Sequence, residues 1–278
     1  MIKFPNAKIN LGLHVIARRE DGYHDLETVF YPIGLKDALE IVPYAEGLPS
    51  APGQRYQLEQ TGLSLQGAAE ENLVIKALKL ISSEKAIPPV EIHLLKKIPF
   101  GAGLGGGSSD AAAMLQLLND LFSLGYTEQQ LITLAARLGA DCAFFIRNQP
   151  ALATGIGDIL EPVDIDLGDL ILVLVKPDIG IPTQTAYAMI TPRKPAQSLR
   201  EIVTLPVSEW KKRMKNDFEA PIFKKYPEIY RIKQQLYARG ALYASMSGSG
   251  SSVYGLFQKE PDLNGLFGNH FVWTSCKL

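Results

Sequence analysis

A glycine-rich segment in the middle of the chain has the composition of an anion-binding loop. Five of the twelve residues from 99 to 110 are glycine, and the segment stands between a strand-like run and a helix-like run. Backbone without Cβ atoms adopts positive φ and approaches a ligand closely. The start of the following helix offers unpaired N–H groups and the positive end of its dipole. Ser108 and Ser109 add hydroxyls for a phosphate, or for a magnesium ion that accompanies ATP. The segment predicts a nucleotide phosphate site.

Three other interpretations of this loop fit the residues less well. A flexible linker would not lead at once into the alanine-rich helix that begins over residues 111–113. A Walker A loop closes with Gly-Lys-Ser/Thr, which this segment lacks. Gly101, Gly103 and Gly106 satisfy the spacing of a dinucleotide-binding loop, but the usual chain-initial strand–loop–helix and the acidic residue about 20 positions later are missing.

Asp141 and Lys8 are the side chains best suited to handle a proton. Asp141 follows a helical pattern and precedes the apolar residues 143–145, where a carboxylate is hard to explain. Lys8 stands at the apolar start of a strand, and Asn10 shares its strand face because side chains two residues apart point to the same side. From these residues alone, a capping aspartate and an exposed strand lysine remain equally good interpretations.

Composition excludes several other classes of protein. The chain has 278 residues, 46% hydrophobic, with a formal net charge of -1, so it can form one large or two modest domains. It has no charge run typical of nucleic-acid or anionic-membrane binding, no apolar run near the roughly 20 residues of a membrane span, and no signal-peptide pattern. Cys142 and Cys276 fit neither a disulfide framework nor a zinc site, so we expect two buried or part-buried thiols in a reducing cytoplasm.

Strand and helix patterns interleave without strict βαβ alternation, which favours an α+β fold that divides into two lobes near residue 150. Asn72 and Thr127 are expected helix N-caps. The expected strands cover residues 9–17, 28–33, 37–42, 56–59, 90–95, 170–175, 242–245, 252–256 and 271–276. The expected helices cover residues 73–80, 110–122, 128–138, 184–189, 208–213 and 228–239.

Four motifs, which follow one another along the chain in the family's order, resemble those of the GHMP kinases, named for galactokinase, homoserine kinase, mevalonate kinase and phosphomevalonate kinase. Pro-x-x-Ala-Gly-Leu-Gly-Gly-Gly-Ser-Ser-Asp, at residues 99–110, resembles the family's phosphate loop. Ala-Lys-Ile-Asn-Leu at residues 7–11, Asp-Gly-Tyr-His-Asp-Leu-Glu-Thr at 21–28 and Ser-Met-Ser-Gly-Ser-Gly-Ser-Ser at 245–252 resemble the first motif, the substrate segment and the third motif of one branch. The agreement covers most of the chain.

The resemblance implies a two-lobed α+β architecture with the active site in the cleft between the lobes. Residues 1–150 would form an N-terminal ATP-binding domain, and residues 151–278 a C-terminal, substrate-side α/β domain. The implied reaction moves the γ-phosphoryl group of ATP, with Mg²⁺, to the 2-hydroxyl of 4-diphosphocytidyl-2-C-methyl-D-erythritol in the non-mevalonate route to isoprenoid precursors. A related kinase for mevalonate or homoserine is the alternative, although those branches lack the Asp-Gly-Tyr-His pairing.

The resemblance also implies a partner and a setting. The partner is a small molecule with a cytidine diphosphate group, rather than nucleic acid or a membrane. The protein would be a cytoplasmic monomer or weak homodimer. Residues 216–219 resemble a further segment of the family, but helix-end capping is the one role that the sequence suggests for them.

Roles for individual residues follow from the resemblance. Asp141 would be the catalytic base, and Lys8 would hold it ionised and orient the attacking hydroxyl. The implied ATP-binding residues are Lys96, Pro99, Gly101, Ala102, Gly103, Leu104, Gly105, Gly106, Gly107, Ser108 and Ser109. The implied substrate-binding residues are Asn10, Tyr23, His24, Thr183, Tyr187 and Gly248. No protein ligand of the metal is implied.

The cytosine base would lie between two aromatic rings. Tyr23 would stack on the base, His24 would hydrogen-bond its edge, and Tyr187 would face it from the other side, although partly exposed packing is the default interpretation of the first two. Thr183 would lie near the diphosphate. Either Lys96 or Lys97 would reach the ATP phosphates; the family pattern favours Lys96, and the other would be a solvated charge.

Overall fold

The computed structural model describes residues 1–44, 55–63, 69–276 and 278. Within them the chain forms two compact units. The first unit consists of Met1–Ala7, Leu35–Phe100 and Gly105–Asn148. The second unit consists of Lys8–Gly34, Gly101–Leu104 and Gln149–Leu278. Each unit is thus assembled from separate stretches of chain. The sequence suggested a single boundary after residue 150, and that boundary stays a prediction.

The first unit is a sheet with helices on one face. Its strands run in the order β1 (Ile2–Lys3), β4 (Ala38–Pro43), β6 (Val90–Lys96) and β5 (Tyr56–Gly62), with β5 parallel to β6 and the other pairs antiparallel. Leu39 and Ile92 are fully buried, whereas the cross-strand pair Glu40 and His93 is half-buried. This alternation places one face of the sheet in the core.

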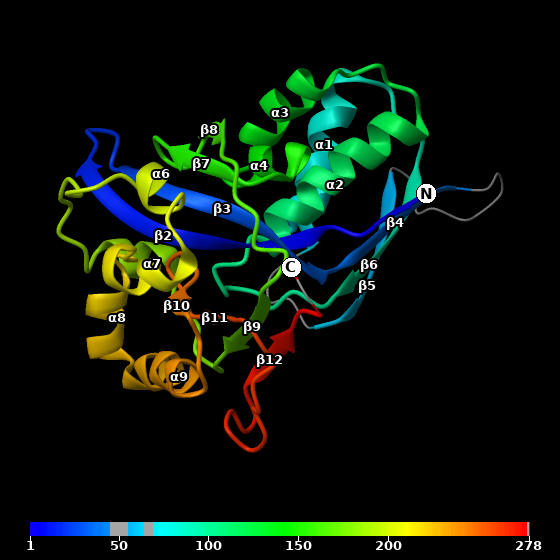
Figure 1. The fold of residues 1–278 in the computed structure, drawn as a ribbon. Coiled ribbons are helices and arrows are strands. Elements are labelled where there is room, and N and C mark those ends of the chain that lie inside the picture. The colour runs from blue at the N-terminus through cyan, green and yellow to red at the C-terminus, as the bar shows by residue number, and fades with distance from the viewer. Residues whose placement is uncertain (45–54, 64–68, 277) are drawn as a thin grey trace. The chain divides into compact units, whose positions relative to one another are not determined.

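The helices of the first unit cover that core face. Helices α1 (Leu73–Glu84) and α2 (Gly106–Leu121) pack side by side, and α2 also contacts β4 and β1 (Figure 1). Asn72 caps α1, since its side chain accepts a hydrogen bond from the Val74 N–H at 2.9 Å. The other helical elements of the unit are η1 (Ala69–Glu71), α3 (Glu128–Ala136) and α4 (Cys142–Arg147).

The second unit contains two four-stranded sheets. One has the order β2 (Asn6–Arg18), β3 (His24–Lys36), β7 (Ala151–Thr154) and β8 (Ile159–Pro162). The other has the order β10 (Tyr243–Met246), β11 (Val253–Phe257), β9 (Ile171–Lys176) and β12 (Phe271–Thr274), all antiparallel. The helices are α5 (Thr183–Tyr187), α6 (Leu199–Ile202), α7 (Val207–Arg213), α8 (Glu219–Lys225) and α9 (Pro227–Ala238).

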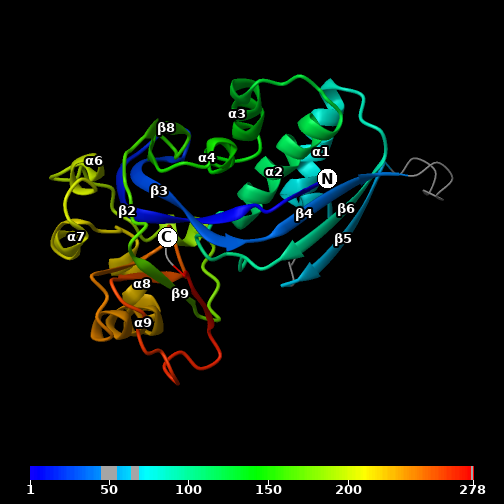
Figure 2. The same cartoon turned by 45° about the vertical axis from the view of Figure 1, so that its right-hand side comes forward.

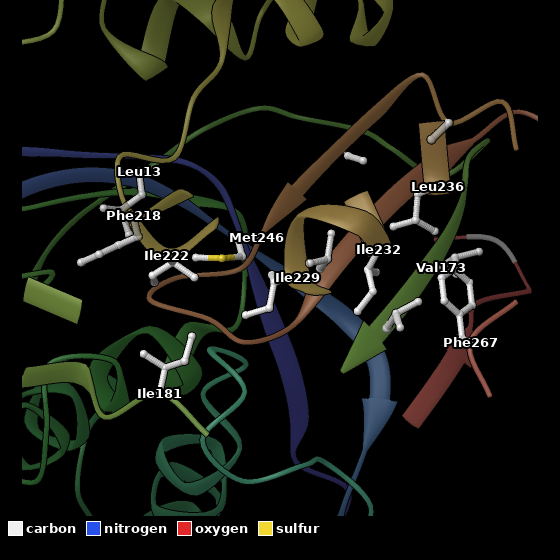
Figure 3. Packing of buried hydrophobic residues seen from close by; sticks show 14 of the residues in the cluster. Leu13, Val173, Ile181, Phe218, Ile222, Ile229, Ile232, Leu236, Met246 and Phe267 are labelled. Atoms are coloured by element: carbon white, nitrogen blue, oxygen red, sulfur yellow. The ribbon is translucent and has the colours of Figure 1, made fainter. Parts of the chain in front are cut away.

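The core of the second unit lies between helices α8 and α9 and the β10-β11-β9-β12 sheet, which Figure 2 shows beside them. Ile229, Ile232 and Leu236 form the buried stripe of α9, at the three- and four-residue spacing of a helix face. They pack against Val173 and Phe267 from the sheet side (Figure 3). Each such aliphatic side chain contributes about 1.5–3 kcal/mol by leaving water.

Most of the expected elements are confirmed within a few residues at their ends. Helix α2 begins at Gly106 rather than at Asp110, because Gly105 turns the chain into the helix from the left-handed region, at φ 69°. The sequence did not predict α4, α6, α8, β7 and β8. These elements are four to seven residues long, and in such short segments helical and strand patterns of apolar residues are easily confused.

The two cysteines differ in their surroundings. Cys142 is buried, as expected, but Cys276 is exposed, so the expectation of a second buried thiol was wrong. Burial raises the pKa of the Cys142 thiol to about 11, which makes a reactive thiolate at that position scarce at neutral pH. Among the described residues, no helix has the length and apolar character needed to cross a bilayer.

We expect Ile232→Ala to destabilise the fold by about 2–5 kcal/mol, because it removes a 2% exposed side chain from the α9 core and leaves a cavity. Gln234→Ala, at an exposed position of the same helix, is the control and should change the free energy of unfolding by less than about 0.5 kcal/mol. Urea unfolding of both variants measures the difference. Equal effects would mean that α9 does not pack as described.

Candidate active site

The first-unit part of the glycine loop is the start of helix α2. Its first turn begins at Gly106, and a Cβ atom there would lie 2.8 Å from Ile98 Cγ2 and 3.5 Å from Lys96 Nζ. A larger residue would therefore push the helix away from β6. Pro99 precedes the loop and is half-buried. Glycine at this position lets the helix N-terminus, with its N–H groups, approach the end of the strand.

The residues after this turn place Asp141 near it. Ser109 is buried, and Ser108 hydrogen-bonds the thiol of Cys142. That contact brings the start of α4 to the start of α2. Asp141 is the N-cap residue of α4, but its side chain makes no capping hydrogen bond. The Asp141 side chain is half-buried. The sequence also allowed a capping role for Asp141, but its carboxylate does not cap α4.

Lys96 lies at the centre of a buried group of three charges. Its ammonium contacts the Asp37 Oδ2 atom and lies 2.5 Å from the Asp110 Oδ2 atom, and the three side chains are 2%, 0% and 3% exposed. The Asp37 Oδ1 atom also accepts the backbone N–H groups of Lys97, at 2.5 Å, and Ile98, at 2.8 Å. The group thus ties the end of β6 to the first turns of α2.

With both carboxyls ionised, this buried group would carry one more negative charge than positive. Burial raises the pKa of the Asp110 carboxyl to about 7; the Lys96 charge opposes the shift and the Asp37 charge adds to it. The Asp110 Oδ1 atom has no hydrogen-bond partner in the described part of the chain. Since the Lys96 ammonium is engaged with two carboxylates, its contact with ATP phosphates stays a prediction. Lys97 is exposed, as a solvated charge would be.

The second-unit part of the loop is held by its two apolar residues. Ala102 and Leu104 are 2% and 1% exposed, and Gly101 before them is exposed with φ 61°. The Ala102 carbonyl accepts the Ser252 N–H at 3.3 Å, and the Leu104 carbonyl accepts the Lys8 N–H at 2.9 Å. The loop is therefore fixed on both sides, to the third motif and to strand β2.

Lys8 and Asn10 form a buried polar pair beside this loop. The Lys8 ammonium donates to Asn10 Oδ1 at 2.7 Å and to the Gly103 carbonyl at 3.1 Å, and it lies 4.8 Å from the centre of the Phe30 ring. The two residues are 3% and 2% exposed. The Asn10 Nδ2 atom donates to Thr28 Oγ1 at 2.9 Å, which fixes the amide so that its oxygen faces Lys8. The exposed-lysine interpretation of Lys8 is therefore wrong.

Two glycine turns meet at this pair. A Cβ atom on Gly103, whose φ is 75°, would lie 2.0 Å from the Ser247 carbonyl oxygen. Gly248, at φ 57°, is close to the pair as well, because its Cβ position is 3.2 Å from Asn10 Oδ1. The Ser247 hydroxyl donates to the Gly103 carbonyl at 2.8 Å. The structure thus brings together four of the predicted site residues: Lys8, Asn10, Gly103 and Gly248.

A second group of predicted residues lies elsewhere in the second unit. The His24 and Tyr187 rings stack with centroids 4.9 Å apart and an interplanar angle of 22°. The Phe218 ring packs against Tyr187 in a T-shaped arrangement, with centroids 4.9 Å apart and an interplanar angle of 89°. Tyr23 is 62% exposed, and Thr183, the first residue of α5, is exposed. An aromatic surface with a polar ring edge is suited to a flat heterocycle.

The described residues contain no group of three or more His, Cys, Asp and Glu side chains that could hold a metal ion. Magnesium that enters with ATP does not need such a group, because it is usually held by phosphate oxygens, water and one or two protein oxygens. The half-buried Ser108 at the start of α2 offers such an oxygen. The donors present fit Mg²⁺ as part of a nucleotide substrate.

Comparison with known sequences defines the class of protein. Residues 72–149 match the family described as GHMP kinases N terminal domain, and residues 198–266 match GHMP kinases C terminal. A protein of Parabacteroides distasonis named 4-diphosphocytidyl-2-C-methyl-D-erythritol kinase is 55% identical over 98% of this chain and 98% of its own. The chain belongs to the GHMP kinase family, and it is an ATP-dependent phosphotransferase.

Solved structures narrow the similarity within the family. A crystal structure of a 4-(cytidine 5'-diphospho)-2C-methyl-D-erythritol kinase is 35% identical with a TM-score of 0.76, over 92% of this chain and 90% of that one. An L. major mevalonate kinase in complex with R-mevalonate is 18% identical with a TM-score of 0.71, over 100% and 96%. The second similarity shows the fold alone. The expected family and α+β fold are confirmed.

We expect Gly103→Ala to abolish tight nucleotide binding, because the added Cβ would meet the Ser247 carbonyl at 2.0 Å. Gly125→Ala is the matched control: its φ is 78°, against 75° at Gly103, but nothing lies within 4 Å of its Cβ position. Both variants lose about 1 kcal/mol or more to backbone strain, so thermal unfolding should shift in both. Titration with an ATP analogue should fail in Gly103→Ala alone; equal affinities would contradict the close approach.

We expect Asp110→Asn to change how stability depends on pH. The unfolded chain releases the Asp110 proton near pH 4, whereas the raised pKa keeps it bound in the folded state until about pH 7. Folding is therefore destabilised progressively as pH rises from about 4 to about 7, and the amide variant should escape this loss. Unfolding midpoints at pH 5 and pH 8 measure it, with the exposed Asp120→Asn on the same helix as control. A parallel pH dependence in Asp110→Asn and the parent would contradict the assignment.

Proposed function

We propose that this chain transfers the γ-phosphoryl group of ATP to the 2-hydroxyl of 4-diphosphocytidyl-2-C-methyl-D-erythritol, with ADP and the 2-phosphate as products, in the non-mevalonate route to isoprenoid precursors. The observation that carries the proposal is the buried pair Lys8–Asn10 held against Gly103 of the phosphate loop. The substrate is inferred from near-full-length identity to a relative named for it.

The proposed mechanism depends on positioning and on charge. Phosphoryl transfer passes through a loose transition state, so that alignment of the two oxygens and neutralisation of the phosphoryl charge matter more than covalent chemistry. The backbone from Gly101 to Ser109 would surround the phosphates of MgATP, with the uncapped first turn of α2 contributing N–H groups. The buried ammonium of Lys8 would stabilise the negative charge of the transferring phosphoryl group.

Asp141 would accept or orient the proton of the attacking hydroxyl. Its carboxylate stands at the start of α4, which the contact between Ser108 and Cys142 brings to the start of α2. In this proposal Lys8 keeps Asp141 ionised while Asn10 contacts the acceptor hydroxyl. The experiment below tests the role of the Asp141 carboxylate.

The cytosine base would be recognised by the aromatic group of the second unit. Tyr187 packs against Phe218 in a T-shaped arrangement and stacks with His24. We infer that the base lies between Tyr187 and the exposed Tyr23, while the His24 ring nitrogens bond its edge and Thr183 lies near the diphosphate. Aromatic side chains suit this role because few rotatable bonds must be ordered.

The same proposal covers the setting of the enzyme. Mg²⁺ would accompany ATP, since the described residues offer isolated oxygens rather than a preformed metal cage. Because the substrate is a small charged molecule, we propose a cytoplasmic location. We also propose that the protein is a monomer or a weak homodimer. Size-exclusion chromatography with light scattering measures the last point directly.

We expect Asp141→Asn to lower kcat by about 10²- to 10⁴-fold, the usual range for loss of a general base, while the affinity for ATP stays within about threefold. ADP release in a coupled assay with ATP and 4-diphosphocytidyl-2-C-methyl-D-erythritol measures it, and the exposed Asp164→Asn serves as control. Unchanged turnover would show that another group handles the proton. Turnover of mevalonate or homoserine in place of the cytidine compound would overturn the proposed substrate.

A further inference from the structure

The segment from Asn216 to Glu219 has a structural role that helix-end capping does not explain. It leads from α7 into α8, whose first residue is Glu219, and Asn216 forms an isolated parallel bridge with Leu13 of strand β2. The Leu13 N–H donates to the Lys215 carbonyl at 2.9 Å, and the Asp217 N–H donates to the Leu13 carbonyl at 2.9 Å. Asn216 itself is 3% exposed. The segment is thus built into the interior of the second unit.

The side-chain amide of Asn216 contacts the backbone on both sides of Ser247, inside the third motif (residues 245–252). Its Nδ2 atom donates to the Met246 carbonyl at 3.0 Å and to the Gly248 carbonyl at 2.8 Å. Its Oδ1 atom accepts the Phe218 N–H at 3.0 Å, which fixes the amide in this orientation. Both amide hydrogens are therefore used, one on each side of Ser247. An unpaired carbonyl in this buried place would be unfavourable, so the amide defines the path of the turn.

Ser247, which lies between the two carbonyls that Asn216 holds, hydrogen-bonds two of the predicted site residues. Its hydroxyl donates to the Gly103 carbonyl at 2.8 Å, and its oxygen accepts the Asn10 N–H at 3.3 Å. Gly103 and Asn10 are the two residues whose oxygens hold the Lys8 ammonium. Ser247 is therefore the single residue that connects Asn216 to the groups around Lys8. All of these contacts lie within the second unit.

The rest of the segment holds neighbouring parts of the same unit. Asp217 accepts the Val15 N–H at 2.9 Å, and the Glu219 Oε1 atom accepts the Met246 N–H at 2.9 Å. Phe218 packs with Leu13, Ile222 and Met246 in the hydrophobic core, as Figure 3 shows.

Glu219 and Phe218 also reach side chains beyond the turn. The Glu219 Oε2 atom forms an ion pair with Lys233 on α9 at 2.6 Å. The Phe218 ring packs against Tyr187 in a T-shaped arrangement. Four consecutive side chains thus contact strand β2, the third glycine motif, helix α9 and the aromatic group.

We propose that Asn216 is a positioning residue for phosphoryl transfer. Its amide holds the turn at residues 246–248, so that Ser247 presses the Gly103 and Asn10 oxygens against Lys8. The proposal rests on the function proposed above, since the placement of Lys8 matters there for the transfer step. Asn216 does not touch the reacting atoms in this account; it sets where Lys8 and the phosphate loop stand.

Asn216→Asp tests this with little change in volume. The variant keeps the acceptor for Phe218 but turns an oxygen towards the Met246 and Gly248 carbonyls, which repels them. We expect backbone amides of Ser247, Gly250 and Ser252, which are hydrogen-bonded in the parent, to exchange with deuterium at least about tenfold faster. We expect kcat to fall about 10²-fold, as a displacement of about 1 Å can cause, with KM for both substrates within about threefold.

Asn119→Asp is the matched control in the first unit. Asn119 also holds a turn with its amide, since it donates to the Tyr126 carbonyl at 3.2 Å and accepts the Tyr126 N–H at 2.9 Å. It should lower the unfolding temperature comparably and leave kcat within twofold. Ser247→Ala is a second variant for the case in which Asn216→Asp does not fold; it cuts the same connection and should show the same fall in kcat with little change in KM.

The outcomes separate this inference from the function on which it rests. Faster exchange at residues 247–252 together with a selective fall in kcat supports the positioning role. Unchanged exchange, or a kcat that falls equally in Asn119→Asp, overturns it. If the parent protein does not turn over the cytidine substrate, the proposed function fails, and the exchange measurement still decides whether Asn216 holds the turn.

Discussion

The site depends on a buried ammonium group that must be solvated by the protein itself. Lys8 is 3% exposed, and a charge taken out of water is unfavourable unless oxygens replace the lost hydration. The oxygens of Asn10 and Gly103 do so at 2.7 and 3.1 Å. This requirement explains why two turns approach so closely: the carbonyl of Gly103 reaches Lys8 because Gly103 has no side chain to keep Ser247 away.

The first unit also contains a buried lysine, Lys96, but carboxylates rather than neutral oxygens surround its charge. Lys96 is enclosed by Asp37 and Asp110, and burial, with the Asp37 charge adding to it, raises the pKa of the Asp110 carboxyl. The arrangement anchors the start of α2 to β6. A cation already balanced by two carboxylates has less effect on a nearby anion than an unbalanced one. Lys8 and Lys96, both predicted to serve the reaction, thus have different surroundings and different expected contributions.

The residues outside the sequence motifs explain why the motifs keep their shape. Asn216 and Glu219 contact the backbone of the third motif at Met246 and Gly248, and Asp37 contacts the backbone just before the phosphate loop. Backbone that turns through positive φ at glycine is otherwise free to take other conformations. Buried side-chain amides and carboxylates hydrogen-bond this backbone and so hold it in one conformation.

The sequence by itself determined the family, the phosphate loop, the main strands and helices, and the candidates Lys8, Asn10 and Asp141. These follow from local spacing: glycines before a helix, alternation along a strand, and motif order. Other features were decided by tertiary structure. Asp37 lies 59 positions from Lys96, and Asn216 lies 32 positions from Gly248. No local pattern pairs residues so distant, because the pairing arises when strands and turns pack and buried polar groups must find partners. Residues 216–219 were noticed in the sequence because they resemble a family segment. Their role could not be inferred there, because their contacts with Met246 and Gly248 form only when the chain folds.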